Sequence, residues 1–226
     1  MQPGEVIGVA WGMYKAHWRH FVAIAFIVYL LVSLLVLLLA FLLGWLGALA
    51  AIFVTVAGVF WVQGALVVAV EDVRDGRADL SLTETLGHVR PHLNTLALAG
   101  LLASIGIFIG LLLLIVPGLY LLTIWSVIVP VIVLEGATVM SSFGRSRELV
   151  RGNGWNSFGV IVLTVLVLIA IAIVVELALF WLPKGVDYYV ITVIRNSLSA
   201  PFAALAWTNM YYRLRDLRTA VPAAAV

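Results

Sequence analysis

Residues Phe21–Val70 read "FVAIAFIVYLLVSLLVLLLAFLLGWLGALAAIFVTVAGVFWVQGALVVAV", a stretch without Asp, Glu, Lys or Arg. About 20 apolar residues in a helix cross a hydrocarbon core of roughly 30 Å, because each residue rises about 1.5 Å. The stretch is long enough for two crossings, and Gly44-Trp45 offers a short turn between them. It therefore predicts a pair of membrane-spanning helices.

The composition of the whole chain supports the same class. The chain has 226 residues, of which 64% are hydrophobic and 11% are charged, whereas a soluble domain has about 45–50% and about 25%. We expect an all-α polytopic membrane protein with a single integral membrane domain over residues 1–226, because the spans leave no room for a soluble domain. The net charge of +2 gives no indication of nucleic-acid binding, and the lack of Cys excludes disulfides and thiolate metal sites.

Hydropathy predicts six spans, which form three pairs joined by short connections at Gly44-Trp45, Pro117-Gly118 and Pro183–Tyr188. The alternative for the first run is a cleaved signal peptide with "GALAA" as its cleavage site. Residues 21–43 exceed the roughly 7–15 apolar residues of a signal peptide, so we interpret the run as a retained span. The spans are approximately His20–Leu43, Trp45–Val70, Asn94–Val116, Leu119–Leu134, Ser157–Leu182 and Tyr188–Tyr211.

The basic residues are distributed unequally between the two sides of this topology. Short loops rich in Lys and Arg stay in the cytoplasm, so the asymmetry predicts that both termini are cytoplasmic. The opposite side would hold only Lys184 outside the spans. The cytoplasmic side would hold Lys15, Arg19, Arg74, Arg77, Arg90, Arg145, Arg147, Arg151, Arg213, Arg215 and Arg218.

A segment with an apolar stripe at helical spacing precedes each pair of spans. Such a helix lies flat at a membrane interface, with its stripe toward the acyl chains and its charges away from them. Ser81 and Glu84 form the S-x-x-E pattern of a capping box, which marks the start of the second segment. The three stripes are Val6, Val9 and Met13; Leu82, Leu86, Val89 and Leu93; and Val139, Phe143, Ser146 and Val150.

The pattern of one interfacial helix followed by one hairpin occurs three times and suggests an internal repeat over residues 4–70, 80–134 and 137–212. Lys15, Arg90 and Arg151 recur as the last basic residue before a span. The alternative is that membrane loops in general end with basic and aromatic residues.

The stretches "PGLYLLTIWSVIVPVIVLEG" (Pro117–Gly136) and "RSRELVRGNGW" (Arg145–Trp155) resemble the signature of a bacterial membrane family. This family is the membrane domain attached to some glycerophosphoryl diester phosphodiesterases, and it is related to the YciC-type inner-membrane proteins. "PGEVIGVAWGMYKAHWRHF" and "ALAWTNMYYRLRDLR" resemble its termini, so the resemblance covers nearly the whole chain, although Ile124 replaces the usual basic residue before Trp125. The matching residues are Pro117, Gly118, Trp125, Pro130, Leu134, Glu135, Gly136, Arg145, Ser146, Leu149, Arg151, Gly152 and Trp155.

The resemblance implies six spans in a bacterial cytoplasmic membrane. It implies no catalytic residues, because the phosphodiesterase chemistry of such fusions belongs to a separate soluble domain. The sequence also lacks the G-x-S-x-G, P-loop and H-E-x-x-H motifs. We therefore expect no enzyme activity and no cofactor.

Glu135 ends the fourth predicted span, where a carboxylate opposes the helix dipole and needs a basic partner. Arg145, Arg147 and Arg151 are the nearest basic residues, so the group is either a structural ion pair or a site for a lipid headgroup or an ion. Pro130 is expected to kink this span, and Pro117-Gly118 is expected to form its preceding turn. The candidate headgroup-binding residues are Lys15, Arg90, Glu135, Arg145, Arg147 and Arg151.

Among the charged residues, Glu176 and Arg195 have the largest free-energy cost of placement in the membrane. Counting from the outer ends of the fifth and sixth spans places both about 9–10 Å deep on neighbouring antiparallel helices, so we expect them to pair. With Asn196 and Ser199 they form a candidate intramembrane polar site, with a polar cavity open toward the outer leaflet. The pair is either purely structural or part of a pathway for a substrate or protons.

A pair of His residues and a pair of Gly residues are weaker features of the sequence. His88 and His92 have the spacing of metal ligands with Glu84 one turn earlier, but Pro91 interrupts that helix. Gly106 and Gly110 form a packing motif.

We expect a protein that binds or helps move phospholipid or a related amphiphile, with anionic membrane lipids as its partners. The alternative is a scaffold or regulatory subunit for a membrane or lipid-metabolism protein, and a selective ion channel is a distant third. The sequence does not indicate an oligomeric state.

Overall fold

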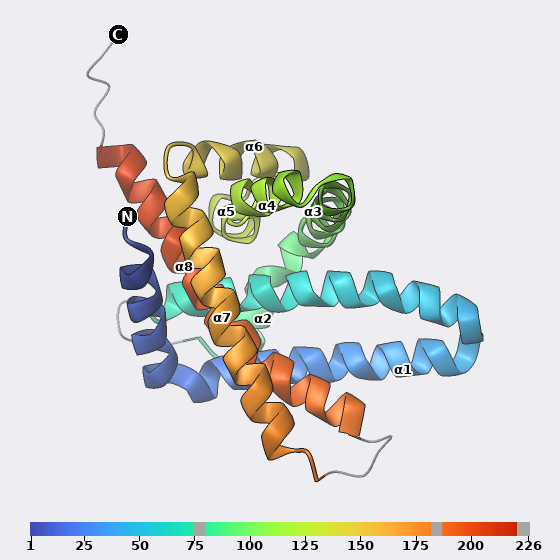
Figure 1. The fold of residues 1–226 in the computed structure, drawn as a ribbon. Coiled ribbons are helices and arrows are strands. Elements are labelled where there is room, and N and C mark those ends of the chain that lie inside the picture. The colour runs from blue at the N-terminus through green and yellow to red at the C-terminus, as the bar shows by residue number, and fades with distance from the viewer. Residues whose placement is uncertain (75–79, 182–186, 221–226) are drawn as a thin grey trace.

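The computed structural model describes residues 1–74, 80–181 and 187–220, and every regular element in these ranges is a helix (Figure 1). Five helical stretches are long and apolar enough to cross a membrane, and the first of them is long enough for two crossings. Arg77 and Lys184 lie outside the described residues, as does most of the Pro183–Tyr188 connection. The elements are α1 (Pro3–Asp72), α2 (Leu82–Val89), the short 3-10 helix η1 (Arg90–His92), α3 (Leu93–Leu113), α4 (Ile115–Ile124), α5 (Ile128–Glu135), α6 (Val139–Val150), α7 (Gly154–Ala178) and α8 (Asp187–Ala220).

Helix α1 consists of three segments separated by two breaks. The first break is at His17, with φ −124° and ψ 23°, and the second is at Gly44, with φ +53° and ψ −124°. Glycine tolerates a positive φ because it has no Cβ, so the predicted turn at Gly44 is confirmed. Figure 1 shows residues 18–43 and 45–72 side by side as an antiparallel pair, with the N-terminal segment set across its base.

The far half of this pair, residues 30–57, projects away from the other helices (Figure 1). We call it the α1 arm. Within it only Gly47 is buried, where a Cβ would overlap the backbone of Leu39 on the neighbouring segment. Phe41 is 87% exposed. The arm therefore presents apolar side chains on its outward faces.

The buried core lies at the base of the α1 pair and along α8. Residues of α1, α3, α5 and α8 form one continuous apolar cluster. The hydroxyl of Tyr14 donates to the carbonyl oxygen of Leu198 at 3.1 Å, and the guanidinium of Arg74 lies 3.5 Å from the centre of the Tyr212 ring. These contacts fix the N-terminal segment and the end of α1 against α8.

The fourth predicted span is divided between α4 and α5 by an irregular turn at residues 125–127. The predicted irregularity is confirmed, and it lies one turn before Pro130 because a proline ring clashes with the carbonyl four residues earlier, here that of Ser126. The predicted turn at Pro117-Gly118 is wrong in position. The chain turns at extended Leu114, with φ −161° and ψ 144°, and Pro117 lies in the first turn of α4.

The apolar stripe of α6 packs on protein, so its predicted contact with acyl chains is wrong. The ring of Phe143 meets that of Trp125 edge to face at 4.9 Å between centroids, and the hydroxyl of buried Ser146 donates to the carbonyl oxygen of Ile124 at 2.7 Å. In the N-terminal segment Val6 is buried but Val9 is exposed. Apart from Val9, the residues of the predicted stripes therefore lie on helix faces that contact the protein core.

Two local predictions are confirmed. Ser81 and Glu84 form a complete capping box at the start of α2, with the Ser81 backbone N–H donating to the Glu84 carboxylate at 2.8 Å. Gly106 and Gly110 face the α4 region, where a Cβ would crowd the Trp125 ring and the backbone of Gly118. The glycine motif is therefore an intramolecular packing site for α4 on α3.

Candidate functional site

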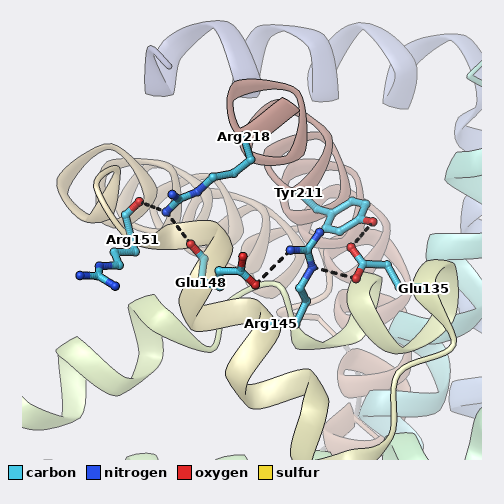
Figure 2. Close-up of polar contacts among 6 residues, drawn as sticks. All are labelled: Glu135, Arg145, Glu148, Arg151, Tyr211 and Arg218. Atoms are coloured by element: carbon cyan, nitrogen blue, oxygen red, sulfur yellow. Dashed lines mark hydrogen bonds and ion pairs between the residues drawn. The ribbon is translucent and has the colours of Figure 1, made fainter. Parts of the chain in front are cut away.

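Glu135 lies at the centre of a polar network that joins α5, α6 and α8 (Figure 2). The Nε of Arg145 donates to Oε2 of Glu135 at 2.9 Å, and the hydroxyl of Tyr211 donates to Oε1 at 2.8 Å. Arg145 also bonds Oε2 of Glu148 at 3.1 Å. The hydrogen bond to Glu135, more than any other contact, raises the pKa of Arg145 above its ordinary value.

A second arginine extends this network from the end of α8. Nη2 of Arg218 donates to the carbonyl oxygen of Glu148 at 2.6 Å and to that of Arg151 (Figure 2). Cationic donors at the last carbonyls of a helix oppose the negative end of its dipole. Arg218 therefore holds the C-terminal end of α6 against α8.

The predicted headgroup-binding residues fall into two groups. Glu135 and Arg145 are engaged with each other and with protein neighbours. Lys15, Arg90, Arg147 and Arg151 are exposed, and the side chain of Arg151 points away from the network in Figure 2. Among the described residues, none of these four forms an ion pair.

Arg147 and Arg151 border a recess of about 560 Å³ between α4, α6 and the start of α7. Tyr120, Glu148 and three glycines, Gly144, Gly152 and Gly154, also line it. A Cβ on any of these glycines would meet no atom within 4 Å. The recess therefore has an open floor at three glycines and two arginine residues among those that line it.

Glu176 and Arg195 form the predicted ion pair, with 3.3 Å between Nη1 and Oε1. One hydrogen bond links these two side chains across α7 and α8. The Glu176 side chain is 52% exposed. Asn196 and Ser199 are half-buried on α8 near Arg195. The structure therefore confirms the pairing of the two charges.

The cavity beside this pair differs from the predicted one in its chemistry. A cavity of about 560 Å³ lies between the N-terminal segment of α1, α7 and α8, and the residues of the candidate polar site do not line it. The polar cavity at these residues therefore stays a prediction. The cavity is lined mainly by apolar and aromatic side chains, among them Ile7, Trp11, Tyr14, Ala170, Leu198 and Phe202.

The apolar cavity is nevertheless next to the ion pair along both helices. Val175 lines the cavity and directly precedes Glu176. Leu198 also lines it and follows Arg195 by three residues, which places the two side chains on neighbouring positions of one helix face. One end of the apolar cavity is therefore close to a charged pair.

Sequence reasoning missed Tyr211 and the apolar cavity. Tyr211 is separated from Glu135 by 76 residues, and no local pattern indicates such a contact. Trp11 and Tyr14 stack at 6.0 Å between ring centroids on the cavity wall. Their spacing of three residues was a signal for an aromatic helix face.

The metal site considered for α2 has no support in the geometry. Among the residues that the structure describes, no group of three or more His, Asp or Glu side chains is placed to hold a metal ion. Nδ1 of His88 lies 2.8 Å from the carbonyl oxygen of Glu84, in a contact within the helix.

No family model matches the chain, and neither a curated protein nor a solved structure matches it. The resemblance to the membrane domain of the phosphodiesterase fusions therefore stays a prediction.

Proposed function

We propose that this chain is a non-enzymatic integral membrane protein that binds or helps move phospholipid or a related amphiphile. The observation that carries the proposal is the apolar cavity between α1, α7 and α8. Ligand pockets have volumes of about 300–1,000 Å³ and are mostly apolar with a few placed polar groups. A cavity of about 560 Å³ with aromatic walls fits the tail of an amphiphile.

In the proposed topology the helices form three hairpins, each preceded by a cytoplasmic interfacial helix, with both termini in the cytoplasm of a bacterium. The distribution of Lys and Arg supports this orientation. The exposed apolar side chains of α7 and of the α1 arm support contact with lipid. Such contact places the cavity beside the acyl chains, from which a tail can enter between Trp11 and Val174.

The ion pair supplies the polar end of the proposed binding site. Arg195 is a guanidinium next to the cavity, and its single contact to half-exposed Glu176 can be exchanged for one to an acidic headgroup. An amphiphile with its tail between α7 and α8 would present a carboxylate or phosphate near Arg195. We therefore favour an acidic amphiphile.

The test is to fill the cavity. Ala170→Trp places an indole among the lining residues, whereas Ala178→Trp adds the same side chain at an exposed position on α7 that does not line the cavity. We expect Ala170→Trp to lower the affinity for a fluorescent polyene fatty acid by about tenfold or more, which corresponds to about 1.4 kcal/mol. Equal affinities in the two variants would contradict the proposal.

A second candidate function is a scaffold for a membrane or lipid-metabolism protein. The α1 arm favours it, because its exposed apolar faces exceed what packing within this chain uses. Photocrosslinkers at Phe41 and Trp45 distinguish the two candidates. Crosslinks to lipid alone favour amphiphile binding, and crosslinks to one stoichiometric protein favour the scaffold.

A further inference from the structure

The recess lined by Arg147 and Arg151 lies beside α6 and is separate from the apolar cavity. Helix α7 starts in the recess at Gly154 and first lines the cavity at Val167. Thirteen residues of helix separate these points, a distance of about 20 Å. The two sites can therefore be occupied and tested independently.

We propose that this recess binds a phosphate monoester through Arg147 and Arg151. The inference names the chemical class of headgroup that the protein binds, and it rests on the proposed function. The chemistry is the same whether the phosphate belongs to a lipid headgroup or to a water-soluble ester.

The charge balance at the recess is the first argument. Glu148 is the carboxylate among the lining residues, and Arg145 pairs with it at 3.1 Å. Because Arg145 and Arg218 are committed to protein partners, the charges of Arg147 and Arg151 remain for a ligand. Two guanidinium groups match a phosphate monoester, which carries about −1.5 to −2 charges at pH 7, better than a phosphodiester with a single charge.

The shape of the recess is the second argument. Gly152 has φ +86°, a conformation that glycine adopts without strain, and the space above Gly144, Gly152 and Gly154 is open. The phosphate oxygens can therefore approach the backbone closely. The exposed phenol of Tyr120 at the wall offers a further hydrogen-bond donor.

The test compares two double variants with the same loss of charge. Arg147→Gln with Arg151→Gln removes the proposed ligands, and Arg19→Gln with Arg213→Gln removes two exposed arginines outside the recess. The probes are a short-chain phosphatidic acid, a short-chain phosphatidylglycerol and glycerol 3-phosphate, titrated into the full-length protein in neutral detergent micelles. Thermal unfolding of each variant checks that it is folded.

We expect the first variant to bind phosphatidic acid about tenfold more weakly than the unaltered protein and the second within about twofold. Binding of glycerol 3-phosphate as well would identify a soluble ester as a sufficient ligand, and binding of phosphatidic acid alone would identify a lipid headgroup. Equal losses in both variants, or equal affinity for phosphatidylglycerol, would overturn the inference. The Ala170→Trp variant separates the two proposals, because it should lose the polyene fatty acid and keep the phosphate monoester.

Discussion

Two of the ion pairs, Glu135–Arg145 and Glu176–Arg195, have the same chemistry and opposite surroundings. Glu135 accepts from two residues on two different helices, and its side chain is 26% exposed. Glu176 accepts from one residue over a longer distance, and its side chain is 52% exposed. The first pair joins three helices, whereas the second leaves its charges available beside a cavity. A charged pair near a membrane can thus stabilise a fold or offer a binding site, and its hydrogen-bond partners distinguish the two roles.

The largest expected effect is on the stability supplied by Glu135. Glu135→Gln weakens the bonds to Arg145 and Tyr211, and we expect the free energy of unfolding to fall by about 2–3 kcal/mol, because hydrogen bonds to charged groups contribute about 1.5–3 kcal/mol. Reversible unfolding by titration with sodium dodecyl sulfate measures it. Glu176→Gln is the matched control at the carboxylate of the other pair, and an equal loss there would remove the distinction between the two pairs.

At the Glu176–Arg195 pair, we expect a substitution to change ligand affinity more than stability. Arg195→Gln should lower the affinity for an acidic fluorescent amphiphile by about tenfold, while the free energy of unfolding changes by at most about 1 kcal/mol, as for other exposed pairs. Glu176→Gln should leave the affinity unchanged or raise it, because it frees Arg195 for the ligand. A fall in affinity for Glu176→Gln equal to that for Arg195→Gln would show that the pair acts only as a structural unit.

A smaller effect tests whether Tyr211 shares in the first pair. Tyr211→Phe removes one hydroxyl that donates to Glu135 at 2.8 Å and keeps the ring, so we expect a loss of about 1 kcal/mol. In the Glu135→Gln background the same change should cost less, because the acceptor is no longer ionised. Additive losses in this double-mutant cycle would contradict a shared network.

The smallest effect concerns Glu84, a carboxylate in full solvent that serves as a reference for both pairs. The hydrogen bond from the Ser81 side chain, followed by that from the Ser81 backbone, lowers the pKa of Glu84. A lowered pKa means that the contribution of the capping box is present at neutral pH and is lost as the pH falls through the folded-state value. The protection factors of the first amides of α2, measured by hydrogen exchange, should therefore fall on acidification, and Ser81→Ala should weaken that pH dependence because it leaves only the backbone hydrogen bond to Glu84.

Local patterns predicted much of the helical architecture and part of the candidate site. The capping box, the turn at Gly44 and the packing of Gly106 and Gly110 depend on a few adjacent residues. The Glu176–Arg195 pair was predictable because unpaired charges are rarely tolerated in hydrocarbon. Each of these features follows from one strong local constraint.

The features that the sequence did not predict depend on tertiary packing. The stripe of Phe143 and Ser146 has the spacing of an amphipathic helix whether its neighbour is lipid or protein, so periodicity alone could not identify the end of α4 and the turn after it as its partners. The cavity depends on the approach of three distant segments, and its apolar character follows from which side of α8 faces Trp11. No window of sequence contains that information.

The most direct measurement is an experimental structure of the protein in lipid nanodiscs with a saturating brominated fatty acid. Amphiphile binding predicts bromine signal between Trp11, Ala170 and Phe202, with the carboxylate of the ligand within hydrogen-bonding distance of Arg195. An empty cavity under the same conditions, with Arg195 still bonded to Glu176, would contradict it.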